Sequence, residues 1–113
     1  MNAIDVSDQD NAIALKKWPV FGIYEPDAIS VFESGGVPYL FTANEGDARE
    51  YTGFTEMRRV SSNATVLDPV IFPNATTLKL PAQLGRLNHT ITLGNTDADP
   101  DFEAIYSLGA RSF

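Results

Sequence analysis

The chain has 113 residues, with 8 Lys or Arg against 15 Asp or Glu, a formal net charge of −7, and no cysteine. This length allows one domain, residues 1–113, and excludes two independent cores. The acidic balance argues against nucleic acid as a partner, and the lack of cysteine excludes disulfides, thiol catalysis and zinc–thiolate sites. No apolar run approaches the ~20 residues of a transmembrane segment. The first residues also lack the pattern of a signal peptide, so a secreted form would have lost a leader or be an internal piece.

The first half of the chain predicts a β-hairpin. Residues 1–17 have acidic side chains early and lysines late, which suits either a short helix or a loop that ends in a short strand. Residues 28–33 and 37–42 are then short apolar stretches rich in β-forming residues. Between them lies Ser34-Gly35-Gly36, and the Gly-Gly pair tolerates the positive φ angles of a tight turn.

The second half predicts loops and further strands. Three prolines between residues 66 and 81 prevent a long helix and indicate an extended surface segment. Residues 87–93 and 104–108 predict strands, separated by an acidic loop. The chain is therefore predicted to be all-β, with antiparallel sheets.

The acidic loop carries oxygen side chains at strictly alternate positions. Side chains two residues apart in a tight loop can converge on one hard cation, and calcium is the natural one. An EF-hand is excluded, because it needs glycine at the sixth loop position and glutamate at the twelfth. A solvated acidic turn is the alternative. The candidate calcium ligands are Asn95, Asp97, Asp99, Asp101 and Glu103.

Three Asn-x-Thr triplets begin at Asn63, Asn74 and Asn88. Chance alone would give about one such triplet in a chain of this composition. The enrichment predicts N-linked glycans in an extracellular setting, and the alternative is that Asn and Thr are common in β turns.

Catalytic patterns are weak. His89 is the only histidine and lies inside a triplet rather than beside a nucleophile, which disfavours a Ser-His-Asp site. Neither a nucleophile elbow nor a phosphate-binding glycine loop is present, and no catalytic residue is assigned. A second-tier polar loop follows the predicted hairpin, and its alternative is a structural turn ordered by a salt bridge. Its residues are Asn44, Glu45, Asp47 and Arg49.

Five segments form a familiar series in order and spacing. They are Trp18-Pro19-Val20-Phe21-Gly22, Pro26-Asp27-Ala28-Ile29, the run from Tyr39 to Tyr51 around Asn44-Glu45-Gly46-Asp47, Leu84-Gly85-Arg86-Leu87, and Gly109-Ala110-Arg111-Ser112-Phe113. In these segments the chain resembles the choice-of-anchor I domain family, which includes the MSP130-type mesenchyme-specific cell-surface glycoproteins.

The resemblance implies a β-propeller, secretion or cell-surface attachment, N-glycosylation and, in animal members, association with calcified matrix. Family members usually show an Asp-Thr-Asp-Gly-Asp-Gly-Asp loop at the position of residues 95–101, and some bacterial relatives carry alkaline-phosphatase labels. Family domains are several times longer, so this chain would supply only part of a ring and would expose unpaired strand edges. Either it is a segment of a longer protein, or copies complete one another's sheets in a ring or filament.

The sequence therefore predicts an extracellular, N-glycosylated structural protein of the matrix or cell surface. It is expected to bind calcium and to assemble through strand pairing, as a homo-oligomer or with the remainder of a longer chain. The alternative is a metal-dependent phosphoester hydrolase that uses the acidic loops. Carbohydrate contacts are a third reading, with Trp18, Tyr24, Tyr39 and Tyr51 as stacking platforms.

Overall fold

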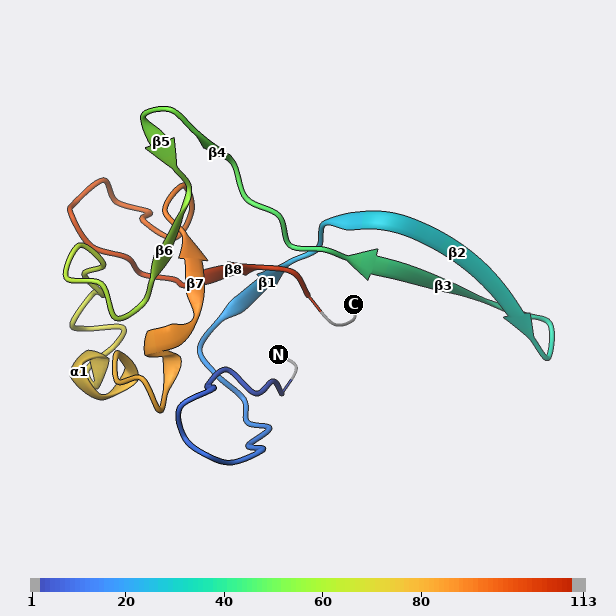
Figure 1. The fold of residues 1–113 in the computed structure, drawn as a ribbon, viewed down its shortest axis with the longest axis horizontal. Helices are drawn as coiled ribbons and strands as arrows, with labels where there is room; N and C mark the ends of the chain where they lie inside the picture. The colour runs from blue at the N-terminus through green and yellow to red at the C-terminus, as the bar shows by residue number, and fades with distance from the viewer. Residues whose placement is uncertain (1–2, 111–113) are drawn as a thin grey trace.

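A computed structural model describes residues 3–110, which form short strands joined by loops (Figure 1). Met1 and Asn2, and the Arg111-Ser112-Phe113 end of the family motif, lie outside the described residues. The elements are β1 Phe21–Ile23, β2 Pro26–Ser34, β3 Val37–Asn44, β4 Glu50–Tyr51, β5 Phe54–Thr55, β6 Met57–Arg59, helix α1 Ala75–Leu78, the 3-10 turn η1 Leu84–Arg86, β7 Asn88–Thr90 and β8 Tyr106–Leu108.

The described strands pair into four two-stranded sheets, which confirms a mostly β fold. Sheets β2–β3, β4–β5 and β6–β7 are antiparallel, as expected. Sheet β1–β8 differs, because its strands run parallel although they come from opposite ends of the chain. Parallel neighbours need a long connection, and here nearly the whole fold lies between them.

The predicted hairpin is confirmed as β2–β3. Its register runs from Pro26 opposite Asn44 to Ser34 opposite Val37. Gly35 and Gly36 both have positive φ, 60° and 77°, which is the type I′ geometry that suits the twist of a two-residue hairpin. The hairpin projects from the rest of the molecule as an arm (Figure 1). The Cα radius of gyration is therefore 16.1 Å, against about 13 Å for a compact domain of this length.

The hydrophobic core lies at the other end, in the part we call the body: residues 3–23 and 46–110. Segment 66–81 was expected to lie extended on the surface; most of its residues are exposed, but the chain forms turns and a short helix instead of an extended segment. Its three prolines stop a long helix, but they leave room for α1 and for apolar side chains that turn inward. The buried core residues are Trp18, Val20, Val60, Leu67, Phe72, Leu78, Leu84, Phe102 and Ile105.

Residues 3–17 form a loop and contain no helix, so the loop alternative is the one observed. Asp5 and Asp10 explain why: their carboxylates accept the backbone N–H groups of Ala14 at 3.0 Å and Ala12 at 3.2 Å. Such side-chain bonds compete with helical ones. The loop closes with a bridge between Ile4 and Lys16.

Candidate functional site

The acidic loop between β7 and β8 brings the predicted ligands into two groups rather than one. Asp97, Asp99 and Glu103 form the first group. Asp101 and Glu103 form the second with Asp68, and in each group the carboxylate oxygens lie within 4.8 Å of one another. Asp68 was not among the ligands predicted from the sequence. It lies beside the loop because its neighbour Leu67 forms a parallel bridge with Phe102.

The loop is shaped by its own side chains. The Asn95 Oδ1 accepts the N–H of Ala98 at 3.0 Å, and its Nδ2 donates to the carbonyl of Asp99. Asp99 in turn accepts the N–H of Asp101 at 2.9 Å. Asn95 therefore supports the turn through its side chain, and its place as an additional ligand stays a prediction.

Two carboxylate oxygens of this loop are buried and have no hydrogen-bond partner within residues 3–110: Oδ1 of Asp101 and Oε1 of Glu103. Burial, followed by the nearby charge of Asp99, raises the pKa of Asp101 to about 6. In contrast, the amide and hydroxyl of Thr96 donate to Glu103 and lower the pKa of that carboxyl. A hard cation would satisfy both free oxygens and offset the repulsion between the carboxylates.

The three triplet asparagines are all exposed. Asn63 follows β6, Asn74 precedes α1 without capping it through its side chain, and Asn88 begins β7. Thr65 and Thr90 of the first and third triplets are fully buried and hydrogen-bonded, so both have a structural role. The exposed Thr76 of the second triplet has no such role among the described contacts, which leaves that triplet without a structural explanation.

His89 is fully buried inside the body. Its Nε2 lies 2.9 Å from the Thr65 hydroxyl, and its ring meets Phe102 edge-on at 5.0 Å. Burial lowers the pKa of His89, so the ring is a neutral core group with no access to a substrate in solvent.

Trp18, a candidate stacking platform for sugars, is also buried, and its indole N–H donates to the carbonyl of Ile4. It is therefore not a stacking platform.

The second-tier polar loop does not converge on one point. Asn44 donates to the carbonyl of Ala110 at 2.6 Å, and Asp47 accepts the N–H of Ala48. The backbone N–H of Glu45 donates to the carbonyl of Glu25 at 3.2 Å. These contacts fix the chain as it leaves β3.

Arg49 of the same loop pairs with Glu56, a buried carboxylate that sequence reasoning did not single out. The Arg49 Nε lies 2.9 Å from Oε2 of Glu56. The hydroxyls of Thr90 and Thr92 donate to Oε1 at 2.8 and 3.1 Å. Hydrogen bonds from Arg49 and then Thr90 lower the pKa of Glu56 to about 2. Glu56 thus ties the polar loop to β7.

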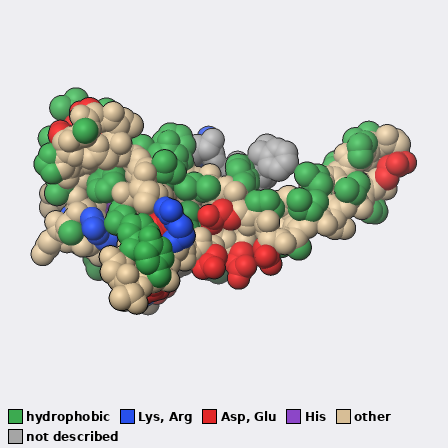
Figure 2. Space-filling model, turned by 90° about the horizontal axis from the view of Figure 1, so that it is seen from above, with side chains coloured by type: hydrophobic (Ala, Val, Ile, Leu, Met, Phe, Trp, Pro, Cys, Tyr) green, Lys and Arg blue, Asp and Glu red, His purple; other side chains and the backbone are tan. Residues whose placement is uncertain are grey.

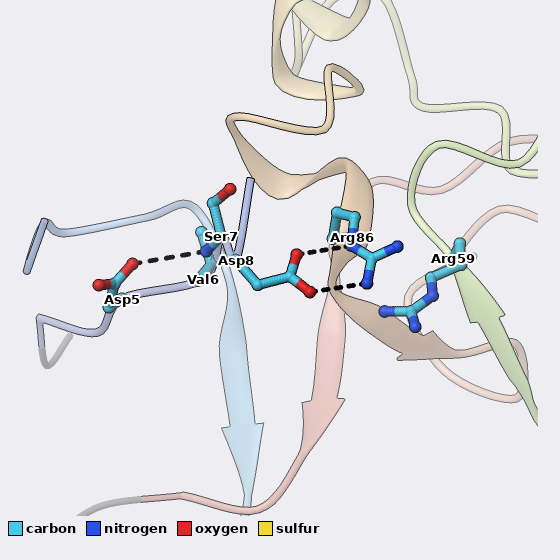
Figure 3. A pocket seen from close by; sticks show the side chains of 6 residues that line it. All are labelled: Asp5, Val6, Ser7, Asp8, Arg59 and Arg86. Atoms are coloured by element: carbon cyan, nitrogen blue, oxygen red, sulfur yellow. Dashed lines mark hydrogen bonds and ion pairs between the residues drawn. The ribbon is translucent and has the colours of Figure 1, made fainter. Parts of the chain in front are cut away.

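A hollow of about 300 Å³ lies beneath the N-terminal loop (Figure 3). Asp8 and Arg86 meet across it in a bidentate ion pair, with distances of 2.6 and 2.7 Å. This pair lowers the pKa of Asp8. Arg59 lines the same hollow. Because Arg86 is already paired, the arrangement fastens residues 3–17 to η1.

The arm has apolar side chains on both sides, because residues paired across the hairpin point to the same side and successive residues to opposite sides. One side, the aliphatic face, carries Ile29, Val31 and Leu40, and the other, the aromatic face, carries Phe32, Tyr39 and Phe41. Phe32 and Phe41 are in edge contact at 6.4 Å. Figure 2 shows these hydrophobic side chains along the arm, with acidic side chains at its tip and near its base.

The chain was compared with known proteins. The family model of the choice-of-anchor I domain matches residues 1–113. No curated protein and no solved structure gives a significant match. Within residues 3–110, none of the helices is long and apolar enough to span a membrane.

Proposed function

This chain belongs to the choice-of-anchor I domain family, and on that premise we propose that it is an extracellular structural unit whose arm associates with other copies. The family implies a cell-surface-related role. The proposal also includes a location in the extracellular matrix and a relationship to the mesenchyme-specific cell-surface glycoproteins. It further includes a propeller-like arrangement of the sheets in the assembly.

The observation that carries it is the exposed arm. Seven large apolar side chains of β2 and β3 are between 49% and 69% exposed: Ile29, Val31, Phe32, Val37, Tyr39, Leu40 and Phe41. An isolated two-stranded hairpin is at best marginally stable in water. Contiguous exposed apolar surface of this kind marks an interaction site.

Sedimentation velocity across a range of protein concentrations tests the association. We expect species larger than the 12.3 kDa chain, with a weight-average mass that rises with concentration. A single 12.3 kDa species at every concentration would refute the proposal.

We also propose that the acidic loop binds calcium, with Asp68 of segment 66–81 as a further ligand. The two buried oxygens without partners, on Asp101 and Glu103, support this assignment. Asp97 and Asp99 complete the candidate set on the exposed side of the loop. Bound calcium would join segment 66–81 to the loop before β8.

Calcium should therefore raise the melting temperature, because a ligand that binds only the folded state stabilises it. Asp101→Asn should abolish this gain, yet without calcium it should be at least as stable as the unaltered protein, since it removes repulsion. Asp27→Asn on the arm is the matched control and should keep the full gain. A melting temperature that calcium does not change would contradict the assignment.

A separate assay addresses the hydrolase alternative. Calcium-dependent turnover of a phosphoester that is lost in Asp99→Ala would support that alternative.

We propose that Asn63, Asn74 and Asn88 carry N-linked glycans, since all three are exposed and lie on the body. Protein from a glycosylating host should lose mass on enzymatic glycan removal and reach the value of the bare chain. Thr76→Ala should remove one glycan with no loss of stability, whereas Thr90→Ala should also destabilise the fold because it breaks the bond to Glu56. A mass unchanged by the enzyme would exclude glycosylation in that host.

A further inference from the structure

A second hollow, of about 540 Å³, adjoins the one beneath the N-terminal loop and shares Arg59 and Arg86 with it. It extends from that loop to β4 and to the sheet β6–β7. Its volume lies within the ~300–1,000 Å³ that sites for small ligands usually have. The hollow therefore has room for a ligand of the size of a sugar.

Asn88, one of the three triplet asparagines, lies in the wall of this hollow. It pairs with Arg59 across the sheet β6–β7, and Met57 lies on the same side of the sheet because it is two residues from Arg59. All three residues line the hollow, and Asn88 remains exposed at its surface. The other two triplet asparagines line neither hollow. Only a glycan on Asn88 would therefore begin at one.

The charges around the hollow favour a neutral ligand rich in hydroxyl groups. Its lining includes the acidic residues Asp5, Asp47 and Glu50 and the basic residues Arg59 and Arg86, so an ion of either sign would meet like charge. Sugar hydroxyls donate to carboxylates and accept from guanidinium groups. The side chains of Arg59 and Glu50 have no hydrogen-bond or ion-pair partner within residues 3–110, so both are available to a sugar.

The hollow also offers apolar surface from separate parts of the chain. Val6 comes from the N-terminal loop, Met57 from β6 and Leu108 from β8. A pyranose ring presents C–H groups on its faces and hydroxyls at its rim, so it suits a lining that mixes apolar and polar side chains. A sugar bound there would contact segments that are far apart in the sequence.

We infer that the first sugar of a glycan on Asn88 lies in this hollow and holds the N-terminal loop, the sheet β6–β7 and β8 together. This inference rests on the proposed N-glycosylation and gives one of the three glycans a structural role. Because the sugar is attached to the wall, its effective concentration in the hollow is on the order of mM or higher, and weak contacts suffice to keep it there.

Enzymatic glycan release from the folded protein, followed at each site by mass spectrometry, tests this placement. We expect release at Asn88 to be several-fold slower than at Asn74, and the two rates to become similar once the protein is unfolded. Arg59→Ala removes a side chain that has no other partner within residues 3–110, so it should speed release at Asn88 and leave the rate at Asn74 unchanged. Similar rates at both sites in the folded protein would overturn the placement.

Melting temperatures provide a second measurement. In protein from a glycosylating host, Asn88→Gln should lower the melting temperature by several degrees, whereas the matched control Asn74→Gln should not change it. In bare protein from a bacterial host, both variants should match the unaltered chain. An equal loss in the bare protein would show that the Asn88 amide stabilises the fold instead of the sugar, which would overturn the placement.

The two proposals fail in different ways. Mass spectrometry that finds Asn88 bare while Asn63 and Asn74 carry glycans would overturn both the glycan on Asn88 and its placement. A glycan found on Asn88, in protein that Asn88→Gln does not destabilise, would overturn the placement alone and leave the proposed glycosylation intact.

Discussion

Replacing Leu40 and Phe41 together with threonine should leave the protein monomeric at concentrations at which the unaltered chain associates. Leu40 lies on the aliphatic face and Phe41 on the aromatic face, so the two substitutions remove apolar surface from both sides of the arm. Full burial of a large apolar side chain contributes roughly 1.5–3 kcal/mol, and these two side chains are already about half-buried, so losing both should weaken association by roughly ten- to a hundredfold. Threonine retains a high strand propensity, which preserves the hairpin itself.

The matched control replaces Ile13 and Leu15, which are also apolar and exposed but lie in the N-terminal loop. Ile13→Thr with Leu15→Thr removes a comparable apolar surface outside the arm and should leave the sedimentation profile unchanged. Equal loss of association in both double variants would mean that general hydrophobicity, rather than the arm, drives assembly. Circular dichroism on both variants checks that the fold is retained.

Glu56→Gln should lower the free energy of unfolding by about 2–3 kcal/mol, the usual worth of hydrogen bonds to a buried charged group. The amide oxygen of glutamine can still accept from Thr90 and Thr92, but the neutral amide loses the ion pair and places an NH2 donor where Oε2 accepted from Arg49. Urea unfolding measures the change. Glu50→Gln, on an exposed neighbouring carboxylate, is the control and should be neutral. Identical midpoints for the two variants would show that the Glu56 network adds nothing to stability.

The same residue predicts how stability depends on acidity. The pKa of Glu56 falls from its ordinary 4.5 to about 2 in the folded state, so the unfolded chain binds a proton more readily. Its contribution is therefore complete above pH 4.5 and is lost as the pH falls toward 2. In Glu56→Gln, the slope of unfolding free energy against pH should flatten in that window.

The hairpin could be predicted from the sequence because everything that defines it is local. Two β-forming stretches and two glycines at the turn fix both strands and their register without help from distant residues. The acidic loop was also predictable as a loop, because Asp side chains that accept nearby backbone N–H groups favour turns.

The partners that complete the candidate sites were not predictable, because they come from far along the chain. Asp68 reaches the acidic loop only through the bridge between Leu67 and Phe102. Glu56 forms an ion pair with Arg49 and accepts a hydrogen bond from Thr90, and no periodic sequence pattern connects these three residues. Likewise, nothing local indicates that two of the three triplet threonines are buried while the third is exposed.

The pairing of β1 with β8 has a consequence for how the chain reaches its fold. Phe21 lies opposite Tyr106, so this sheet closes a loop that spans most of the sequence, and such contacts form late because their entropic cost is high. The β2–β3 hairpin, with its two-residue turn, can form within microseconds. A newly made chain therefore displays its apolar arm before its body is closed.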